Sequence, residues 1–263
     1  MKDSELHSFC QCLSVKAPIV LNITNYVAMN MSANALLALG ASPIMSFYPA
    51  EMEDLVDISS AVCVNIGCLD NMQIEAIDMA VSRAEKRGKP WVLDPVGVGA
   101  SHVRQELVGR LLDKYRPSVI RCNASEILEI YKIMIGEKCE NVNISRGVDV
   151  VPGIDDEIVI EAANKVAARY STVVSVSGAI DYITDGNVVE CVKYGSPIMP
   201  KVTAMGCTAS AITAACLAIT SEKPLAAAIA AMNIMGICGE RSASKADGPG
   251  SFVSFFIDQL YRV

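Results

Sequence analysis

Charged and aromatic residues are scarce in this chain of 263 residues. Lys, Arg, Asp and Glu make up 19% of the sequence and aromatic residues 5%, against 52% hydrophobic residues, and the formal net charge is −7. A nucleic-acid-binding surface needs a basic patch, and base stacking needs aromatic side chains. The composition therefore argues against a nucleic-acid partner and against an acidic membrane surface. The apolar content is sufficient for a large buried core.

Several motifs of catalysis and cofactor binding are missing. The only two histidines are His7 and His102, which argues against a His-based metal centre or catalytic triad. There is no G-x-x-x-x-G-K-[ST] sequence, so the chain is not a P-loop kinase. No glycine fingerprint opens the first predicted strand-helix turn, and Gly97-Val-Gly99 lacks the third glycine of that pattern. A nicotinamide-dependent enzyme is therefore disfavoured.

Ten cysteines are present, but none form a C-x-x-C pair. The usual signature of a zinc or dithiol site is thus absent from the sequence. The N-terminal segment also lacks the long apolar core of a signal peptide. A chain of this length folds without disulfides, so we expect mostly buried, free thiols in a reducing cytoplasm.

Residues 202–221 carry no charge and are long enough to span a bilayer. Ala, Thr, Ser, Gly and Cys dominate this run, however, and such a composition inserts poorly. We therefore predict a helix buried at the centre of the protein and no membrane segment.

Short apolar runs alternate with longer helical patterns along the chain. Strands are predicted at residues 18–22, 43–47, 61–66, 91–94, 118–121, 172–176, 181–184 and 188–192. Helices are predicted at residues 26–39, 52–60, 70–87, 103–115, 124–135, 155–168, 207–220, 225–240 and 250–261, and a surface loop at 148–156. The alternation, without a linker or repeat, predicts one α/β domain over residues 1–263. We expect a three-layer sandwich in which helices cover both faces of a mainly parallel central sheet.

Asp94-Pro-Val-Gly-Val-Gly99 directly follows a predicted strand. Ligands collect at the carboxyl ends of parallel strands in sheets of this kind. The carboxylate of Asp94 could hold Mg²⁺ or its water, and the glycines let the main chain approach a phosphate. The alternative is an aspartate that caps the turn before the next helix.

Arg121, Asn123 and Glu126 lie at the end of another predicted strand. Arg121 could clamp a phosphate, and Glu126 could act on Mg²⁺ through water. Asn123 and Glu126 also have the spacing of a capping box, which explains them without any ligand. Both interpretations can hold, because a glutamate at a helix N-terminus is well placed to share a site with Asp94.

The most informative segment is Val202-Thr-Ala-Met-Gly-Cys-Thr208. A glycine-containing turn leads into a helix whose N-terminal N–H groups and dipole can bind an anion, which suits a phosphoryl group in transit. Cys207 falls in the predicted first turn, where the pKa of a thiol tends to be lowered, so it could accept the proton of an attacking alcohol. The alternative is a small buried residue without a chemical role.

Ser177-Gly-Ala-Ile-Asp181 follows a further buried strand. A serine and a glycine at such a place can hydrogen-bond nucleotide phosphates. A plain turn explains the same residues.

Taken together, these segments resemble the hydroxyethylthiazole kinases of the ribokinase-like superfamily, from about Pro18 to the last helix. The motifs that carry the resemblance are, in order, Thr24-Asn-Tyr-Val27, Ala33-Asn-Ala35, Gly40-Ala-Ser-Pro-Ile-Met45, Asn65-Ile-Gly67, Asp94-Pro-Val-Gly-Val-Gly99, Asn123-Ala-Ser-Glu126, Ser177-Gly178 with Asp181, and Gly206-Cys207. The resemblance implies a ribokinase-like fold. It also implies Mg²⁺-dependent transfer of the γ-phosphoryl group of ATP to 5-(2-hydroxyethyl)-4-methylthiazole, for thiamine biosynthesis or salvage.

The resemblance implies roles for individual residues as well. The thiazole pocket would be lined by Asn25, Val27, Met45, Gly67 and Ala204. ATP would be bound by Arg121, Asn123 and Ser177, and Mg²⁺ would be organised by Asp94 and Glu126. Gly206 and Cys207 would form the anion hole, with Cys207 as base or orienting group. The family also forms homotrimers with each active site at a subunit interface.

Ala204 departs from the family pattern, which often reads Thr-Gly-Thr-Gly-Cys at this place. An alanine at a positive φ costs about 1 kcal/mol or more. We expect a compatible backbone there and retained activity. Ser177 stands where threonine is commoner, and it keeps the hydroxyl.

Two other functions are alternatives to this one. One is a kinase of another small alcohol, such as hydroxymethylpyrimidine, and the other is an inactive thiazole- or nucleotide-binding protein. The joint presence of Asp94, Glu126 and Cys207 favours a kinase, since a binding module does not need a set for phosphoryl transfer.

Overall fold

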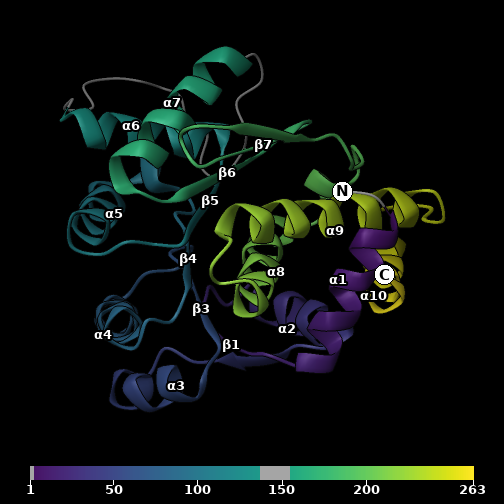
Figure 1. Ribbon diagram of the computed structural model, residues 1–263, viewed down its shortest axis with the longest axis horizontal. Helices are drawn as coiled ribbons and strands as arrows, with labels where there is room; N and C mark the ends of the chain where they lie inside the picture. Colours follow the sequence, from purple (N-terminus) through teal and green to yellow (C-terminus); the bar gives the residue numbers. More distant parts are fainter. Residues whose placement is uncertain (1–2, 137–154) are drawn as a thin grey trace.

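A central sheet of eight strands forms the middle of the protein, whose computed structural model describes residues 3–136 and 155–263 (Figure 1). The strand order is β2-β1-β3-β4-β5-β6-β7-β8. The pairs from β2 to β6 are parallel, and β7 and β8 are added antiparallel at one edge. The strands are β1 (Ile19–Ile23), β2 (Ser42–Met45), β3 (Ala61–Asn65), β4 (Trp91–Asp94), β5 (Val119–Asn123), β6 (Val173–Ser177), β7 (Asp181–Thr184) and β8 (Val189–Val192).

Helices cover both faces of this sheet (Figure 1). One layer contains α3 (Met52–Ile58), α4 (Asn71–Arg87), α5 (His102–Lys114), α6 (Ala124–Ile135) and α7 (Asp156–Tyr170). The other contains α1 (Asp3–Lys16), α2 (Met29–Ala38), α8 (Met205–Ile219), α9 (Pro224–Ala243) and α10 (Pro249–Arg262). Three short 3-10 helices lie in the connections: η1 (Pro49–Glu51), η2 (Val98–Ala100) and η3 (Met199–Lys201). The predicted three-layer α/β sandwich is confirmed.

The central strands, such as β3 and β4, are mostly apolar because the sheet is buried on both faces there. In β3, Val62 and Val64 point into the core beneath α3 to α7, and Ala61 and Cys63 into the core beneath α8 and α9. Successive residues of a strand face opposite sides, so each short apolar run serves both cores.

The uncharged run after residue 201 forms α8, which packs over β1, β3 and β4. Its small residues let the helix lie close to the sheet, and Ser210 and Thr213 are fully buried there. The predicted buried helix is thus confirmed. Among the described helices, none has both the length and the apolar character needed to cross a membrane.

Several sequence-based boundaries differ from the structure. Helix α1 was not predicted, although Leu6, Cys10 and Leu13 have helical spacing and are buried. Helix α2 begins three residues later than predicted, because the Asn25 side chain holds the preceding turn. Helix α8 begins two residues earlier than predicted. The predicted loop at 148–156 lies mostly outside the described residues, and its last two residues instead start α7.

Nine cysteines lie in the described residues and all are free; Cys139 lies outside them. Five of the nine are buried: Cys10, Cys63, Cys122, Cys216 and Cys238. The expectation of free, mostly buried thiols is confirmed for this part of the chain.

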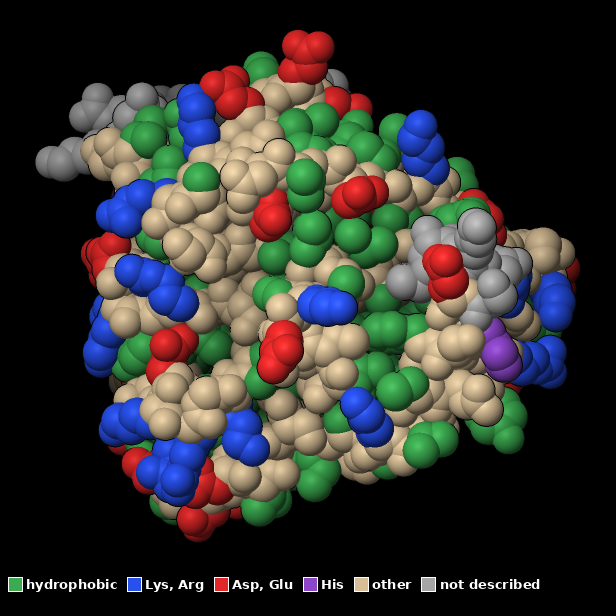
Figure 2. Space-filling model, in the orientation of Figure 1, with side chains coloured by type: hydrophobic (Ala, Val, Ile, Leu, Met, Phe, Trp, Pro, Cys, Tyr) green, Lys and Arg blue, Asp and Glu red, His purple; other side chains and the backbone are tan. Residues whose placement is uncertain are grey.

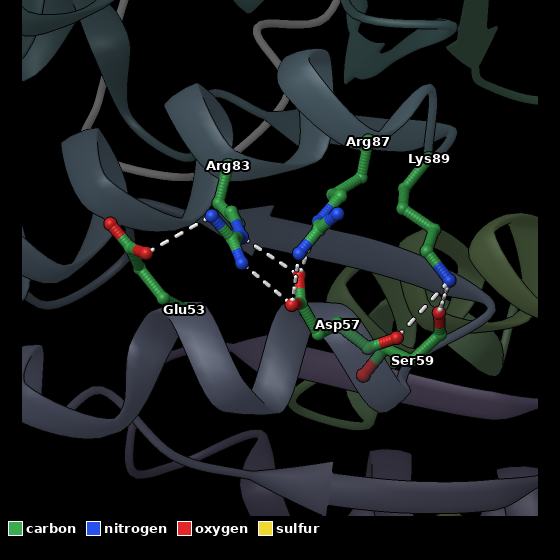
Figure 3. Close-up of polar contacts among 6 residues, drawn as sticks. All are labelled: Glu53, Asp57, Ser59, Arg83, Arg87 and Lys89. Carbon is green, nitrogen blue, oxygen red and sulfur yellow. Dashed lines mark hydrogen bonds and ion pairs between the residues drawn. The ribbon is translucent and has the colours of Figure 1, made fainter.

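An ion-pair network holds α3 against α4 (Figure 3). The carboxylate of Asp57 accepts hydrogen bonds of 2.6–2.9 Å from Arg83 and Arg87, and Lys89 donates to the carbonyl of Ser59 at 2.7 Å. The two guanidinium groups hold the pKa of Asp57 well below its usual range. On the face drawn in Figure 2, basic and acidic side chains lie side by side in the region of α3 and α4.

Candidate active site

Asp94 lies at the carboxyl end of β4 and is fully buried. Its Oδ2 atom accepts two hydrogen bonds, from Nδ2 of Asn65 at 2.6 Å and from Oγ of Ser210 at 2.7 Å. Its Oδ1 atom is buried and has no hydrogen-bond partner among the described residues. Burial raises the pKa of Asp94, while Arg121, Ser210 and Asn65 oppose that shift. The carboxylate is thus fixed by one oxygen and leaves the other for a ligand.

A chain of side-chain amides connects Asp94 to the segment after β1. Asn65 accepts, through Oδ1, from Nδ2 of Asn25 at 3.0 Å and from the main-chain N–H of Gly67 at 2.9 Å. Asn25 accepts from the N–H of Ala28 at 3.0 Å. These contacts bring Asn25 and Gly67, both predicted for the thiazole pocket, next to the predicted metal residue.

Glu126 joins the ends of β4 and β5. Its Oε2 atom accepts from the N–H of Asn123 at 2.9 Å, and the side chain of Asn123 accepts from the N–H of Glu126, which confirms the capping box. Its Oε1 atom accepts from the N–H of Gly97 at 3.0 Å. Burial and the nearby charge of Asp94 raise the pKa of Glu126 to about 7. The capping box therefore explains the contact of Oε2 but not the contact of Oε1 with Gly97.

Arg121 is buried in the middle of this group and donates to Oγ of Ser177 at 2.5 Å. A Cβ atom at Gly206 would lie 2.7 Å from Nη1 of Arg121, so only glycine allows this approach. Burial lowers the pKa of Arg121, but the carboxylates of Asp94 and Glu126 outweigh it and leave the pKa raised. The guanidinium therefore stays charged beside the N-terminus of α8, where both favour an anion.

Cys207 lies in the first turn of α8, and its Sγ atom accepts from Nδ2 of Asn25 at 3.3 Å. The expectation that the helix N-terminus lowers the thiol pKa is wrong. Burial, together with the negative charge of Asp94, raises the pKa of Cys207 to about 11. The thiol is therefore protonated at neutral pH, which weakens the prediction that it acts as a base.

Ala204 immediately precedes α8 and has a φ of 67° and a ψ of 2°. The expectation of a backbone compatible with alanine is therefore wrong, because this left-handed region favours glycine. The strain amounts to about 1 kcal/mol.

Val27 is more exposed than the other predicted pocket residues, and Met45 lies on an edge strand of the sheet. Val27 is 60% exposed, and Met45 is half-buried at the end of the edge strand β2. Tyr26 is also 60% exposed and contacts Phe47 edge to face, with ring centroids 5.6 Å apart. An apolar surface thus borders the buried polar group on the side of β2.

Sequence comparison places this site in a known family. The family model for hydroxyethylthiazole kinase matches residues 10–263. The chain belongs to the hydroxyethylthiazole kinase family. A hydroxyethylthiazole kinase of Brachyspira hyodysenteriae is 45% identical over 259 residues, which cover 98% of this chain and 94% of that protein. The membership confirms the resemblance and the enzyme class predicted from the sequence.

Solved structures agree with this placement. The hydroxyethylthiazole kinase protein from Pyrococcus horikoshii OT3 superposes with a TM-score of 0.88 at 34% identity, covering 99% of this chain and 94% of its own. A ribokinase-like superfamily protein from Enterococcus faecalis gives a TM-score of 0.65 at 12% identity, covering 95% of this chain and 88% of its own. The second likeness confirms the ribokinase-like fold alone.

Three residues of this hydroxyethylthiazole kinase site were not predicted from the sequence. Asn65 was part of a recognised motif but had no role assigned. Ser210 lies one helical turn after Gly206, a spacing that could have pointed to it. Arg104 of α5 reaches main-chain carbonyls of two loops that follow β3 and β4. Only the tertiary structure reveals that contact.

Proposed function

We propose that this chain transfers the γ-phosphoryl group of ATP to the hydroxyl of hydroxyethylthiazole, in thiamine biosynthesis or salvage. The observation that carries the proposal is the meeting of Asp94, Arg121 and the N-terminus of α8 at one buried point. Phosphoryl transfer needs positioning and charge neutralisation more than covalent chemistry, and these groups supply both. The amide chain through Asn65 places the proposed thiazole residues beside them.

Mg²⁺ fits the residues at this point. Asp94 offers a buried oxygen without a hydrogen-bond partner among the described residues, and Glu126 lies close enough for the charge of Asp94 to raise its pKa. The described residues hold no group of three or more acidic, His or Cys side chains for a metal, which suits an ion that keeps its waters and binds substrate phosphates. We propose that Asp94 and Glu126 organise the ion, which would neutralise phosphate charge when bound.

The remaining roles follow from the same geometry. Arg121 and Ser177 would contact the phosphates of ATP, with Asn123 holding the loop beside them. Gly206 and the N–H groups around Cys207 would form the anion hole for the transferred group. A thiol with a pKa of about 11 suits orientation of the acceptor hydroxyl better than proton abstraction. We therefore assign Cys207 as an orienting group.

The acceptor would lie against Asn25, Gly67 and Ala204, with Val27 and Met45 at the outer side. Because Val27 is 60% exposed, a second subunit would complete the pocket there. We propose a homotrimer with active sites at its interfaces, which sedimentation analysis can test. A cytoplasmic location is supported by the free thiols of the described residues.

The test of this function is ADP release from ATP and Mg²⁺, with hydroxyethylthiazole and hydroxymethylpyrimidine offered separately. Turnover with the thiazole alone is expected. Turnover only with the pyrimidine would replace the proposed acceptor. ATP binding without ADP release from either alcohol would contradict the kinase and support a binding protein.

A further inference from the structure

The side chain of Arg104 binds three main-chain carbonyl oxygens at once. Its Nη1 atom donates to Ile66 at 2.6 Å and to Val96 at 2.5 Å, and its Nη2 atom donates to Gly67 at 2.8 Å. Arg104 lies in the first turn of α5, where Ser101 caps the helix. One partly buried guanidinium thus connects a helix to two separate loops.

One of these two loops belongs to the proposed acceptor pocket, and the other belongs to the proposed metal and phosphate site. Ile66 and Gly67 follow β3, and Gly67 belongs to the proposed acceptor pocket. Val96 follows β4, between Asp94 and the Gly97 N–H that Glu126 binds. The strands are parallel neighbours, with Asn65 opposite Asp94. The sheet therefore sets where the loops begin, and Arg104 sets how far apart they lie beyond it.

The three carbonyl oxygens need hydrogen-bond donors between them. Each carbonyl carries a partial negative charge, and their approach to one point is unfavourable unless a donor satisfies them. The planar guanidinium of arginine can donate hydrogen bonds to several oxygens in different directions, whereas a lysine ammonium is a single point charge. Among the described residues no carboxylate forms a salt bridge with Arg104, so its charge is directed to the loops.

We propose that Arg104 is a positioning residue that holds the acceptor loop at Gly67 in register with the metal and phosphate loop at Asp94–Gly97. Its loss would let the two loops separate while the sheet stays intact. The acceptor hydroxyl would then lie off line from the γ-phosphate, and a displacement of about 1 Å can lower the rate about 100-fold. This inference rests on the proposed function, because it assumes that the acceptor binds at Gly67.

The test uses Arg104→Ala and Arg104→Lys in the full chain, with Arg110→Ala as a matched control on the same helix. Arg110 pairs with Asp78 at the protein surface, at 2.9 Å, and does not reach either loop. For Arg104→Ala we expect kcat/KM for the thiazole to fall about 10- to 100-fold, with the KM for ATP within about twofold. Millimolar guanidinium should restore part of this loss, and Arg104→Lys should lie between the alanine variant and the wild type.

Arg110→Ala should match the wild type in all constants. A folded Arg104→Ala with wild-type constants for the thiazole would overturn the proposal. A rise in the KM for ATP as large as that for the thiazole, without guanidinium rescue, would also overturn it, because that pattern indicates general destabilisation. If Arg104→Ala does not fold, the same comparison is made with Arg104→Lys alone. An inactive wild-type protein would instead overturn the proposed function itself.

Discussion

Ser210 donates a 2.7 Å hydrogen bond to Oδ2 of Asp94, although the two residues are 116 positions apart. The contact fixes the N-terminal turns of α8 to the carboxyl end of β4. The proposed anion-binding helix end and the proposed metal ligand are therefore held together by this contact. With Asn65 on the same oxygen, the carboxylate presents Oδ1 in one orientation.

Removing this hydrogen bond should weaken metal-dependent turnover. In Ser210→Ala the carboxylate of Asp94 loses one of its two donors, and a lost bond to a charged group costs about 1.5–3 kcal/mol. We expect a higher Mg²⁺ concentration for half-maximal activity, and a smaller rise in melting temperature when Mg²⁺ and ATP are added together. Thr213→Ala is the control, since that hydroxyl donates only to Ala209 of its own helix. Equal Mg²⁺ dependence of the two variants would contradict the role of Ser210.

Asp94→Asn removes the negative charge that is proposed to hold the metal ion, while keeping the shape of the side chain. It should impair Mg²⁺-dependent turnover severely, on the order of 100-fold or more in kcat if the charge holds the ion. The assay is ADP release over a Mg²⁺ titration, with circular dichroism as a check of folding. Unaltered Mg²⁺ dependence would refute the metal role of Asp94.

Cys207→Ala should lower kcat more than it raises KM if the thiol orients the acceptor in the transition state, as proposed. We expect a decrease of about 10-fold, less than the roughly 100-fold or more expected for a general base. The raised thiol pKa, about 11, also predicts slow alkylation by iodoacetamide at pH 7 to 8 compared with exposed Cys12. Unchanged kcat in the alanine variant would make the thiol structural.

Ala204→Gly should stabilise the protein, since it relieves a positive φ at an L-residue. The greater chain entropy of glycine in the unfolded state offsets part of the relieved strain. The expected net gain in unfolding free energy is therefore about 0.5–1 kcal/mol. Urea unfolding measures it. Ala33→Gly within α2 is the control and should lose about 1 kcal/mol. A loss of stability at both positions would show that the turn before α8 is not strained.

The pH dependence of stability should change in Asp181→Asn. Burial raises the pKa of Asp181 to about 6, and its carboxylate accepts from the N–H of Gly178 at 3.0 Å. The folded state therefore binds the proton of Asp181 more tightly than the unfolded state does, because the unfolded pKa is near 4. The contribution of the protonated side chain to stability is lost as the pH rises from about 4 to 6. An asparagine keeps the acceptor without the charge.

We expect Asp181→Asn to gain stability at pH 7, up to about 2 kcal/mol, and little at pH 4. Asp185→Asn serves as the control, because hydrogen bonds from Asn187 and Val188 lower the pKa of Asp185. Removal of the Asp185 charge should give no gain in stability at pH 7. The same shift of stability in both variants would contradict the assignment to burial at Asp181.

The sequence predicted most of the fold because its signals are local. The predicted helix at 70–87 corresponds to α4, in which Asp70 is the N-cap and Gly88 is a left-handed C-cap. Asn123 and Glu126 predicted their capping box for the same reason. Helix α1 was missed, since its amphipathic pattern is weak and its burial depends on α8 and α9.

Most residues of the candidate site could be predicted from the sequence, because the ends of parallel strands meet at one edge and the family motifs follow those ends. Asp94, Arg121, Glu126 and Gly206 are brought together as that rule requires. What the tertiary structure alone decided is the environment of each group. The thiol of Cys207 is buried next to a carboxylate, and Ser210 and Arg104 reach partners from distant elements. Burial and long-range hydrogen bonds depend on the packing of the whole chain, and no local pattern specifies them.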